Sequence, residues 1–377
     1  MANQEKITVL AVGDVCVNRK DPDSAFASVT PTIQSADIAF CQLETNYSER
    51  GIALPQARTP LRAHPRNAPA IKKAGFNVVS FASNHHMDFG ADALLDTIDT
   101  MRETGIELIG VGKNIEEARR SQIVDCKGTK VAFLAYSSIL PFGYWADEKK
   151  PGCAPIRGFT VYEQAEPDQP GTPALIHSFA HAGDKAAMIK DIQKAKGQAD
   201  IVMVSIHWGI HYKEAEIAMY QNEVGYAALD AGADVILGHH AHILKAIEIY
   251  KGKPIFYSLC NFVFDLELPS HVLNDPHRVA RVQRLNPSWR VDPQYKAYPF
   301  PVDSRMTIGA KIIISDKKIR KVSILPAYVN EDSSPRFLSK KNKEFSDVVS
   351  YMERITKAQG MDTQYQIEGD EVVVSLD

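Results

Sequence analysis

The segment GADVILGHHAH at residues 232–242 indicates the fold most clearly, because a short apolar run ends there in a cluster of histidines. Short apolar runs bounded by glycine and charged residues are typical of buried strands. His240 and His242 follow this run with one small residue between them, a spacing suited to metal chelation from a loop. A single His-x-His pair is weak evidence, so the prediction depends on whether other strands end in the same way.

Further apolar runs predict buried strands, and helical segments alternate with many of them. The predicted strands are Ile7–Val12, Ile38–Leu43, Val78–Ala82, Val131–Tyr136, Ile201–Ile206, Val235–Leu237 and Ile255–Leu259. The predicted helices are Ala91–Thr104, Lys185–Lys196 and Glu214–Ala231. This alternation predicts an α/β protein in which helices cover a sheet.

Polar side chains follow several of these runs, at the point where each predicted strand ends. They are Asp14, Glu44, Asn84, His85 and His207. Ligands bind outside the carboxyl ends of strands in open α/β sheets, so these residues and the histidines of 232–242 are expected at one edge. Asp, Glu, Asn and His are ligands of divalent metals, and a pair of such ions attracts anions and acidifies water. The pattern therefore predicts a two-metal hydrolase.

Each of these positions also has an ordinary structural interpretation. The Gly13-Asp14 pair is common in turns, and Asn84 is a typical helix N-cap. Glu44 at a strand end is usually solvated, and His207 could be a half-buried histidine with its hydrogen bonds satisfied. The ordered combination is much harder to explain by chance than any single member.

Composition excludes several other classes of protein. The 377 residues suffice for one large domain or two smaller ones, and 45% are hydrophobic, which is too apolar for a disordered chain. The 43 basic and 46 acidic residues argue against nucleic acid as a partner. Five scattered cysteines without a C-x-x-C pair exclude a thiolate zinc finger and fit a reducing compartment.

No apolar run approaches the length of a membrane span, and the run at Ile7–Val12 is too short for a signal peptide. We therefore expect a cytoplasmic protein, whose oligomeric state the sequence leaves open. We expect one domain over residues 1–330, closed by a hairpin of Met306–Ser315 and Lys321–Tyr328. Insertions near 141–173 and 266–305 resemble lids, and 331–377 is expected to be a helical extension with its helix near Phe345–Lys357.

The order of the motifs resembles the CapA family, named for poly-γ-glutamate capsule synthesis, within the calcineurin-like metallophosphoesterase superfamily. The resemblance covers residues from about Ile7 to Tyr328. It is carried by Gly13-Asp14-Val15, Gln42-Leu43-Glu44, residues 83–90 (SNHHMDFG), His207-Trp208-Gly209, residues 232–242, and residues 257–262 (YSLCNF). It implies an α/β fold of the calcineurin-like type, a four-layer αββα sandwich.

The resemblance also implies a two-metal centre. Asp14 and His242 would hold the first ion, Glu44 would bridge both ions, and the second ion would be held by Asn84, His207 and His240. The two divalent ions would be Mn, Fe or Zn, all of which accept nitrogen and oxygen ligands. Hydroxide assisted by these ions would attack a phosphoester or a related anionic substrate, small or polymeric.

Catalytic and substrate-binding roles follow from the same resemblance. His85 would protonate the leaving oxygen, and Asp88 would orient His85, with a capping role as the equal alternative. The residues expected near the substrate are Arg19, Trp208, His211 and His239. For Arg19 a solvated arginine at a helix start is the equal alternative, and for His239, as for His86, a structural role is favoured over a catalytic one. Asn261 is expected to hold a loop rather than to contact substrate.

The chain departs from the family pattern at three positions. Cys16 stands where the superfamily has the histidine of an Asp-x-His motif, so Cys16, Thr45 or Asn46 could complete the shell of the first ion. His211 replaces a glutamate and Cys260 replaces a glycine. Two other functions therefore stay open: a poly-γ-glutamate or γ-glutamyl polymer protein that synthesises, processes or binds the polymer, and a binding module without catalysis.

Overall fold

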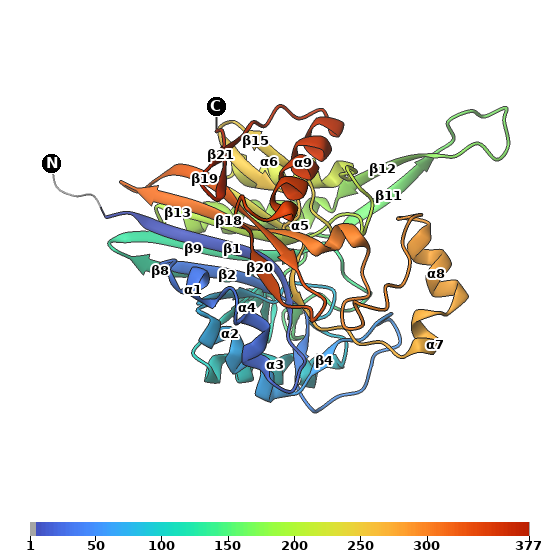
Figure 1. The fold of residues 1–377 in the computed structure, drawn as a ribbon, viewed down its shortest axis with the longest axis horizontal. Helices are drawn as coiled ribbons and strands as arrows, with labels where there is room; N and C mark the ends of the chain where they lie inside the picture. The colour runs from blue at the N-terminus through green and yellow to red at the C-terminus, as the bar shows by residue number, and fades with distance from the viewer. Residues whose placement is uncertain (1–4, 377) are drawn as a thin grey trace.

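Two large β-sheets pack against each other at the centre of the computed structural model, which describes residues 5–376 (Figure 1). The start of the chain, on which the signal-peptide prediction partly rests, lies outside the described residues. Phe40 and Phe133 stack across the two sheets, with their ring centroids 6.1 Å apart. The space between the sheets is the main hydrophobic core.

The first sheet has ten strands and mixes parallel with antiparallel pairs. Its order is β21 (Tyr365–Glu368), β22 (Glu371–Val374), β19 (Lys318–Val329), β18 (Met306–Ser315), β1 (Ile7–Cys16), β2 (Ile38–Leu43), β5 (Val78–Ser80) and β6 (Leu108–Ile109), with β17 (Asn261–Phe264) beside β1 and β20 (Pro335–Phe337) beside β19. The second sheet has six strands in the order β15 (Ile247–Tyr250), β16 (Lys253–Phe256), β14 (Val235–His239), β13 (Ile201–His207), β9 (Thr129–Ser137) and β8 (Gln122–Cys126).

Helices cover the outer faces of both sheets. Helices α1 (Thr30–Gln34), α2 (Pro69–Ala74) and α3 (Gly90–Glu103) lie on the side of the first sheet, together with the 3-10 turns η1 (Pro22–Phe26) and η2 (Pro65–Asn67) (Figure 1). Helices α5 (Ala182–Lys196) and α6 (Met219–Asp230) pack on the second sheet through a separate core. The expected αββα sandwich is therefore confirmed.

The alternation of side chains along strand β13 determines which of them point toward the space between the sheets. Val202, Val204 and Ile206 pack with the outer helices, whereas Ile201 and Met203 belong to the core between the sheets. Successive side chains of a strand point to opposite faces, so His207 shares the inward face with Ile201 and Met203. The parallel neighbour β14 pairs His239 with His207, which places His239 on the same inward face.

The two predicted insertions have structure of their own. Within 141–173, strand β10 (Gly152–Cys153) pairs with β7 (Val111–Gly112), and β11 (Gly158–Glu163) pairs with β12 (Leu175–Ala180) as a hairpin that projects from the body (Figure 1). Within 266–305 lie α7 (Ser270–Leu273), α8 (Pro276–Gln283) and η3 (Val302–Arg305). The remaining short elements are β3 (Asn46–Tyr47), β4 (Arg62–Ala63) and α4 (Ile115–Ala118).

The segment after residue 330 differs from the expected helical extension. Its helix α9 (Lys343–Ala358) is present, but β20, β21 and β22 also add strands to the first sheet. Helix α6 begins at Met219 rather than at Glu214, and the strand predicted at Ile255–Leu259 runs instead over Lys253–Phe256. Among the described residues, the helices are all too short or too polar to cross a membrane.

Candidate metal centre

Three fully buried side chains from both sheets meet at the carboxyl ends of their strands. Asp14 lies near the end of β1, Glu44 directly follows β2, and His207 ends β13. One ligand atom from each residue lies within 4.8 Å of the others. Glu44 is held beside β1 because its backbone N–H donates to the carbonyl of Val15 at 2.9 Å.

Asn84 and His240 extend this cluster on the side of the second sheet. The Asn84 Oδ1 atom lies 2.8 Å from His207 Nε2 and 3.1 Å from His240 Nδ1. The two imidazole nitrogens themselves are 3.0 Å apart. These three expected ligands of the second ion therefore converge on one point from separate strand ends.

His242 lies close to Asp14 on the other side of the cluster. Its Nδ1 is 3.7 Å from Asp14 Oδ2. His240 and His242 both have left-handed backbones, with φ of 86° and 55°. Non-glycine residues held in this region store strain of about 1–3 kcal/mol, a feature that concentrates at functional sites.

Several buried polar atoms of this cluster have no hydrogen-bond partner among the described residues. They are Asp14 Oδ1, both carboxylate oxygens of Glu44, His207 Nδ1 and both ring nitrogens of His239. Glu44 Oε1 lies 3.0 Å from His207 Nδ1, but the two atoms are not aligned as donor and acceptor. Leaving such atoms unpaired costs about 1–3 kcal/mol each, so the donor set fits bound divalent cations, which would satisfy them.

Burial dominates the electrostatics of the cluster. It raises the pKa of the Glu44 carboxyl well above its usual range, and the charges of Asp14 and Asp88 add to this. It lowers the pKa of His207 and His240, and neighbouring imidazoles lower both further. The imidazoles are therefore neutral at neutral pH, which is the form that binds a metal ion.

His85 and Asp88 form the expected pair. The Asp88 Oδ2 atom lies 2.7 Å from His85 Nδ1 and also accepts the backbone N–H of Leu61 at 2.8 Å. Helix α3 begins at Gly90, and no side chain caps it. These contacts favour the orienting role of Asp88 over the capping role. His85 Nε2 lies 3.8 Å from Glu44 Oε2, and the ring keeps 12% exposure, so a substrate can reach it.

Two of the residues expected near the substrate are engaged elsewhere. The Arg19 guanidinium pairs with Asp265, with Nε 2.9 Å from Oδ2, and also donates to the carbonyl of Asp332. The Trp208 indole is buried in the core beneath α5 and α6 and donates to the carbonyl of Tyr257 at 3.0 Å. The structure does not bring these two side chains into the cluster.

His211 and His239, the other two residues expected near the substrate, lie at the cluster itself. The His211 ring centroid is 3.9 Å from that of His240, and its Nε2 is buried without a partner among the described residues. His239 Nδ1 lies 3.2 Å from Asp14 Oδ1, on the floor of the site between the sheets. His86 contacts the backbone carbonyls of Ser83 and Tyr144, at 2.6 and 2.8 Å, which indicates the structural role.

The three side chains considered for the first ion differ in their contacts. The Cys16 thiol donates to the carbonyl of Asp265 at 3.7 Å and packs in an apolar cluster with Phe264. Asn46 Nδ2 donates to the carbonyls of His85 and His86, each at 3.1 Å, and so supports the loop that carries His85. Thr45 Oγ1 and Asn46 Oδ1 are both buried without a hydrogen-bond partner among the described residues.

We expect Arg19→Met to destabilise the fold while leaving metal content unchanged. The Arg19 and Asp265 side chains are 16% and 8% exposed, so removing the arginine leaves a largely buried carboxylate unpaired. Breaking such a pair costs about 3 kcal/mol, measurable as a lower denaturation midpoint in urea. The double change Arg19→Met with Asp265→Leu should recover much of the loss. Unchanged stability with a raised KM would instead support the substrate-binding role.

Sequence reasoning missed Lys245, which supports the segment behind His211. The Lys245 ammonium is 2% exposed and donates to the carbonyls of Lys213 and Glu216, the latter at 2.8 Å. Burial lowers the pKa of Lys245 from 10.5 to about 8. The sequence around Lys245 does not predict that this side chain is buried, because only the fold shows which loop covers it.

The pH dependence of stability should reveal this lysine. The folded chain loses the Lys245 proton near pH 8, whereas an unfolded lysine keeps it to about pH 10.5. The unfolded state binds more protons in this window, so the contribution of Lys245 to stability rises with pH. The unfolding free energy of the wild type relative to Lys245→Met should increase by roughly 3 kcal/mol from pH 8 to 10.5. A flat or falling difference in urea titrations would contradict this.

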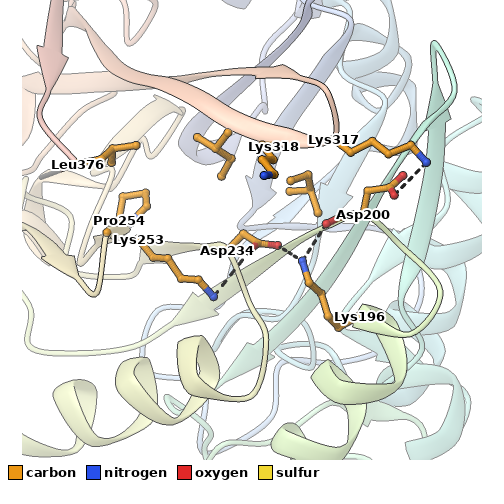
Figure 2. Close-up of a pocket in the computed structure, with 11 residues that line it drawn as sticks. Lys196, Asp200, Asp234, Lys253, Pro254, Lys317, Lys318 and Leu376 are labelled. Carbon is orange, nitrogen blue, oxygen red and sulfur yellow. Dashed lines mark hydrogen bonds and ion pairs between the residues drawn. The ribbon is translucent and has the colours of Figure 1, made fainter.

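A separate groove lies at the amino ends of β13 and β14, at the opposite edge of the second sheet from the cluster (Figure 2). It has a volume of about 350 Å³ and is lined by lysines and two aspartates. Lys196 Nζ lies 2.8 Å from Asp234 Oδ2, and Lys317 Nζ lies 3.2 Å from Asp200 Oδ1. Lys253 donates to the carbonyls of Leu229 and Ala233. These contacts tie strand ends together, so the groove is structural in character.

Two stacked sheets between helical layers, with buried Asp, Glu, Asn and His side chains at the strand ends, form the arrangement that the motifs of the chain predicted. Residues 8–266 match the family described as bacterial capsule synthesis protein PGA_cap. The chain therefore belongs to that family, as the motifs indicated.

Named relatives agree with the family. The chain is 31% identical to the capsule biosynthesis protein CapA of Bacillus anthracis, over 69% of this chain and 60% of that protein. It is 29% identical to the PGA biosynthesis protein CapA of Bacillus subtilis, over 67% of this chain and 62% of that protein. A probable polyglutamine synthesis accessory protein of Mycobacterium tuberculosis is 31% identical over 62% and 57%. The matches thus span about 60% of these relatives.

Solved structures matched to the chain share little of its sequence. A hypothetical protein from Thermus thermophilus has a TM-score of 0.45 at 14% identity, over 85% of this chain and 98% of that one. The calcineurin-like phosphoesterase YfkN from Bacillus subtilis has a TM-score of 0.38 at 13% identity, over 94% and 98%.

Proposed function

We propose that this protein is a metal-dependent hydrolase that cleaves a phosphoester or a related anionic substrate. One observation carries the proposal: Asp14, Glu44 and His207 place ligand atoms within 4.8 Å of one another, while buried oxygens and nitrogens of the same residues lack hydrogen-bond partners among the described residues. A purely structural cluster would satisfy these atoms with protein donors and acceptors, because buried polar groups are otherwise costly.

The residues divide into two groups around the proposed ions. Asp14 and His242 would hold the first ion, Asn84, His207 and His240 would hold the second, and Glu44 would contact both; the short distances within each group support this division. Bound Mn, Fe or Zn ions would acidify water and polarise the substrate at this position. The neutral imidazoles and the two carboxylates would leave the loaded site net positive, which favours anionic substrates.

His85 would act as the general acid. Its Nδ1 contacts the Asp88 carboxylate, so Nε2 is left to face the substrate, and a protonated ring can donate Nε2–H to a leaving oxygen. Asp88 itself is fixed by the Leu61 N–H, which limits how far the imidazole can turn. The pair therefore supplies a positioned proton next to the cluster.

Metal content and hydrolysis of simple esters test this proposal together. Purified protein, depleted with chelator and reloaded with Mn²⁺, Fe²⁺ or Zn²⁺, should bind about two ions per chain and regain hydrolysis of phosphomonoesters or phosphodiesters. Protein that binds no divalent ion after reloading would exclude the proposal. The ion that restores the highest rate would identify the preferred metal.

A second candidate function, a polymer-handling protein, is favoured by arginines beside the cluster. The positive charges of Arg281 and Arg58 lower the pKa of His211, after the larger effects of burial and of His242 and His85. Arg278 Nε is buried without a hydrogen-bond partner, and neither Arg278, Arg281 nor Arg58 pairs with a carboxylate within 4.0 Å among the described residues. Unpaired arginines at a cationic site suit a ligand with repeated anionic groups.

The relatives named for capsule and PGA biosynthesis make poly-γ-glutamate the first polymer to test. Binding should weaken with salt and should fall in the variant Arg278→Gln with Arg281→Gln. The variant Lys318→Gln with Arg320→Gln, at the exposed turn between β18 and β19, removes two positive charges as well and is the matched control. No binding of the polymer at low salt would exclude this second candidate and leave the hydrolase proposal intact.

A further inference from the structure

Position 16 does not supply a ligand to the first ion of the proposed centre. The Cys16 thiol points to the carbonyl of Asp265 and packs beside Phe264. Asp14, His242 and the shared Glu44 are then the expected ligands on that side. This inference rests on the proposed function, and it concerns the residue that completes this shell.

Asn261 lies beside two of these expected ligands, Asp14 and His242. It begins strand β17, which runs parallel to β1, and it is in register with Asp14. Its side chain is fully buried, and its Oδ1 lies 2.7 Å from His242 Nδ1. The same nitrogen is 3.7 Å from Asp14 Oδ2. Three potential ligand atoms from three separate segments are thus grouped at one end of the cluster.

The close approach of β1 and β17 is built into the backbone. The Asp14 N–H donates to the carbonyl of Cys260 at 3.0 Å. A Cβ at Gly13 would lie 1.8 Å from that carbonyl oxygen, so only glycine permits this approach. Cys260 itself has a φ of 67°, a strained conformation for a residue with a side chain. The strain and the glycine together place Asn261 beside Asp14.

The orientation of the Asn261 amide follows from its hydrogen bonds. The Tyr298 hydroxyl donates to the carbonyl of Ser304 at 2.5 Å. Its oxygen can then accept from Asn261 Nδ2, which lies 2.9 Å away. The amide nitrogen is therefore committed to Tyr298, and Oδ1 faces His242 and Asp14.

We propose that Asn261 Oδ1 is a ligand of the first metal ion, together with Asp14, His242 and Glu44. Amide oxygens bind divalent ions of this kind, and adjacent ligands at about 2.1 Å from one ion lie about 3 Å apart. The distances of 2.7 and 3.7 Å around His242 Nδ1 bracket that value. Asn46, another nearby amide, has a buried Oδ1 without a partner among the described residues, but its Nδ2 donates to the carbonyls of His85 and His86, whereas Asn261 adjoins both His242 and Asp14.

The main rival role for Asn261 is to position His242 by accepting its Nδ1–H. Loss of a partner that only orients a ligand lowers metal affinity by about 10–100-fold, whereas loss of a ligand costs more. Stoichiometry and affinity therefore separate the two roles without an activity measurement.

The test is titration of metal-free protein with Co²⁺, followed by visible absorption and by metal analysis. Asn261→Leu should bind one ion where the wild type binds two, with the second affinity weakened more than about 100-fold. Asn261→Asp, which restores a ligand oxygen and adds charge, should bind two ions at least as tightly as the wild type. Asn77→Ala is the matched control, because the Asn77 side chain hydrogen-bonds, within residues 5–376, to the backbone of Ala39 and Asp37 at the far strand ends.

The outcomes distinguish this inference from the proposed function. The ligand role would be overturned if Asn261→Leu bound two ions as tightly as the wild type does. It would also be overturned if the affinity of Asn261→Leu for the second ion fell by only about 10–100-fold. Weaker binding by Asn261→Asp would overturn it as well, and this variant decides the question if Asn261→Leu does not fold. A wild type that binds no ion would contradict the proposed function instead.

Discussion

Alanine at both Asp14 and His240 is expected to reduce bound metal from about two ions per chain to nearly none, and to abolish hydrolysis. The two changes remove one ligand from each side of the cluster, since Asp14 lies near His242 whereas His240 contacts Asn84 and His207. Neither remaining half offers a complete ligand set. Metal analysis of the purified variant, together with initial rates on a generic phosphodiester, measures both effects.

The control for this double variant is Asp200→Ala with His177→Ala. It removes one carboxylate and one imidazole outside the cluster, from the lysine-lined groove and from the projecting hairpin. This control should keep full metal content and full activity. If the Asp14 and His240 variant kept its full metal content, the assignment of the cluster as a metal centre would be wrong.

His85→Gln is expected to lower kcat by about 10²–10⁴-fold while leaving both metal ions bound. His85 approaches Glu44 only at 3.8 Å and contacts Asp88 directly, so its loss removes a proton donor rather than a ligand. The defect should shrink for substrates whose leaving group needs no protonation, such as nitrophenyl esters. Steady-state rates on an alkyl and a nitrophenyl ester, measured beside metal content, separate these effects.

Asp88→Asn should produce a smaller loss than His85→Gln, because the amide still fills the site but is a weaker acceptor for His85 Nδ1–H, so the imidazole is held less firmly. His64→Gln is the matched control, since His64 is an exposed histidine that caps η2. Loss of metal in His85→Gln would show that His85 is a ligand. Equal losses on both esters would show that it does not protonate the leaving group.

Local sequence patterns predicted where most of the buried strands begin, because burial on both faces leaves a clear signal. The strand Ile38–Leu43 was predicted with its observed bounds, and every residue in it is buried. The start of helix α6 was predicted five residues too early. Residues 214–218 (EAEIA) are good helix formers, but they form the loop over Lys245 instead. Tertiary contacts overrode local propensity there.

The roles of some individual side chains could not be predicted in the same way. Arg19 follows the Gly-Asp motif closely enough to suggest an anion clamp, yet its partner Asp265 lies 246 residues away. Asn261 was expected only to hold a loop. Its closeness to His242 and Asp14 depends on a parallel strand pair and on the Tyr298 hydroxyl, neither of which leaves a local pattern.

Local patterns of amino acids were enough to establish the class of fold and the kinds of atoms available at its functional edge. Apolar runs with polar ends specify buried strands, because alternation and burial act over a few neighbouring residues. Which polar side chains face one another, and which are already paired, became known only from the folded arrangement. Those pairings depend on strand order, register and inward or outward direction, which join residues hundreds of positions apart and have no local signature.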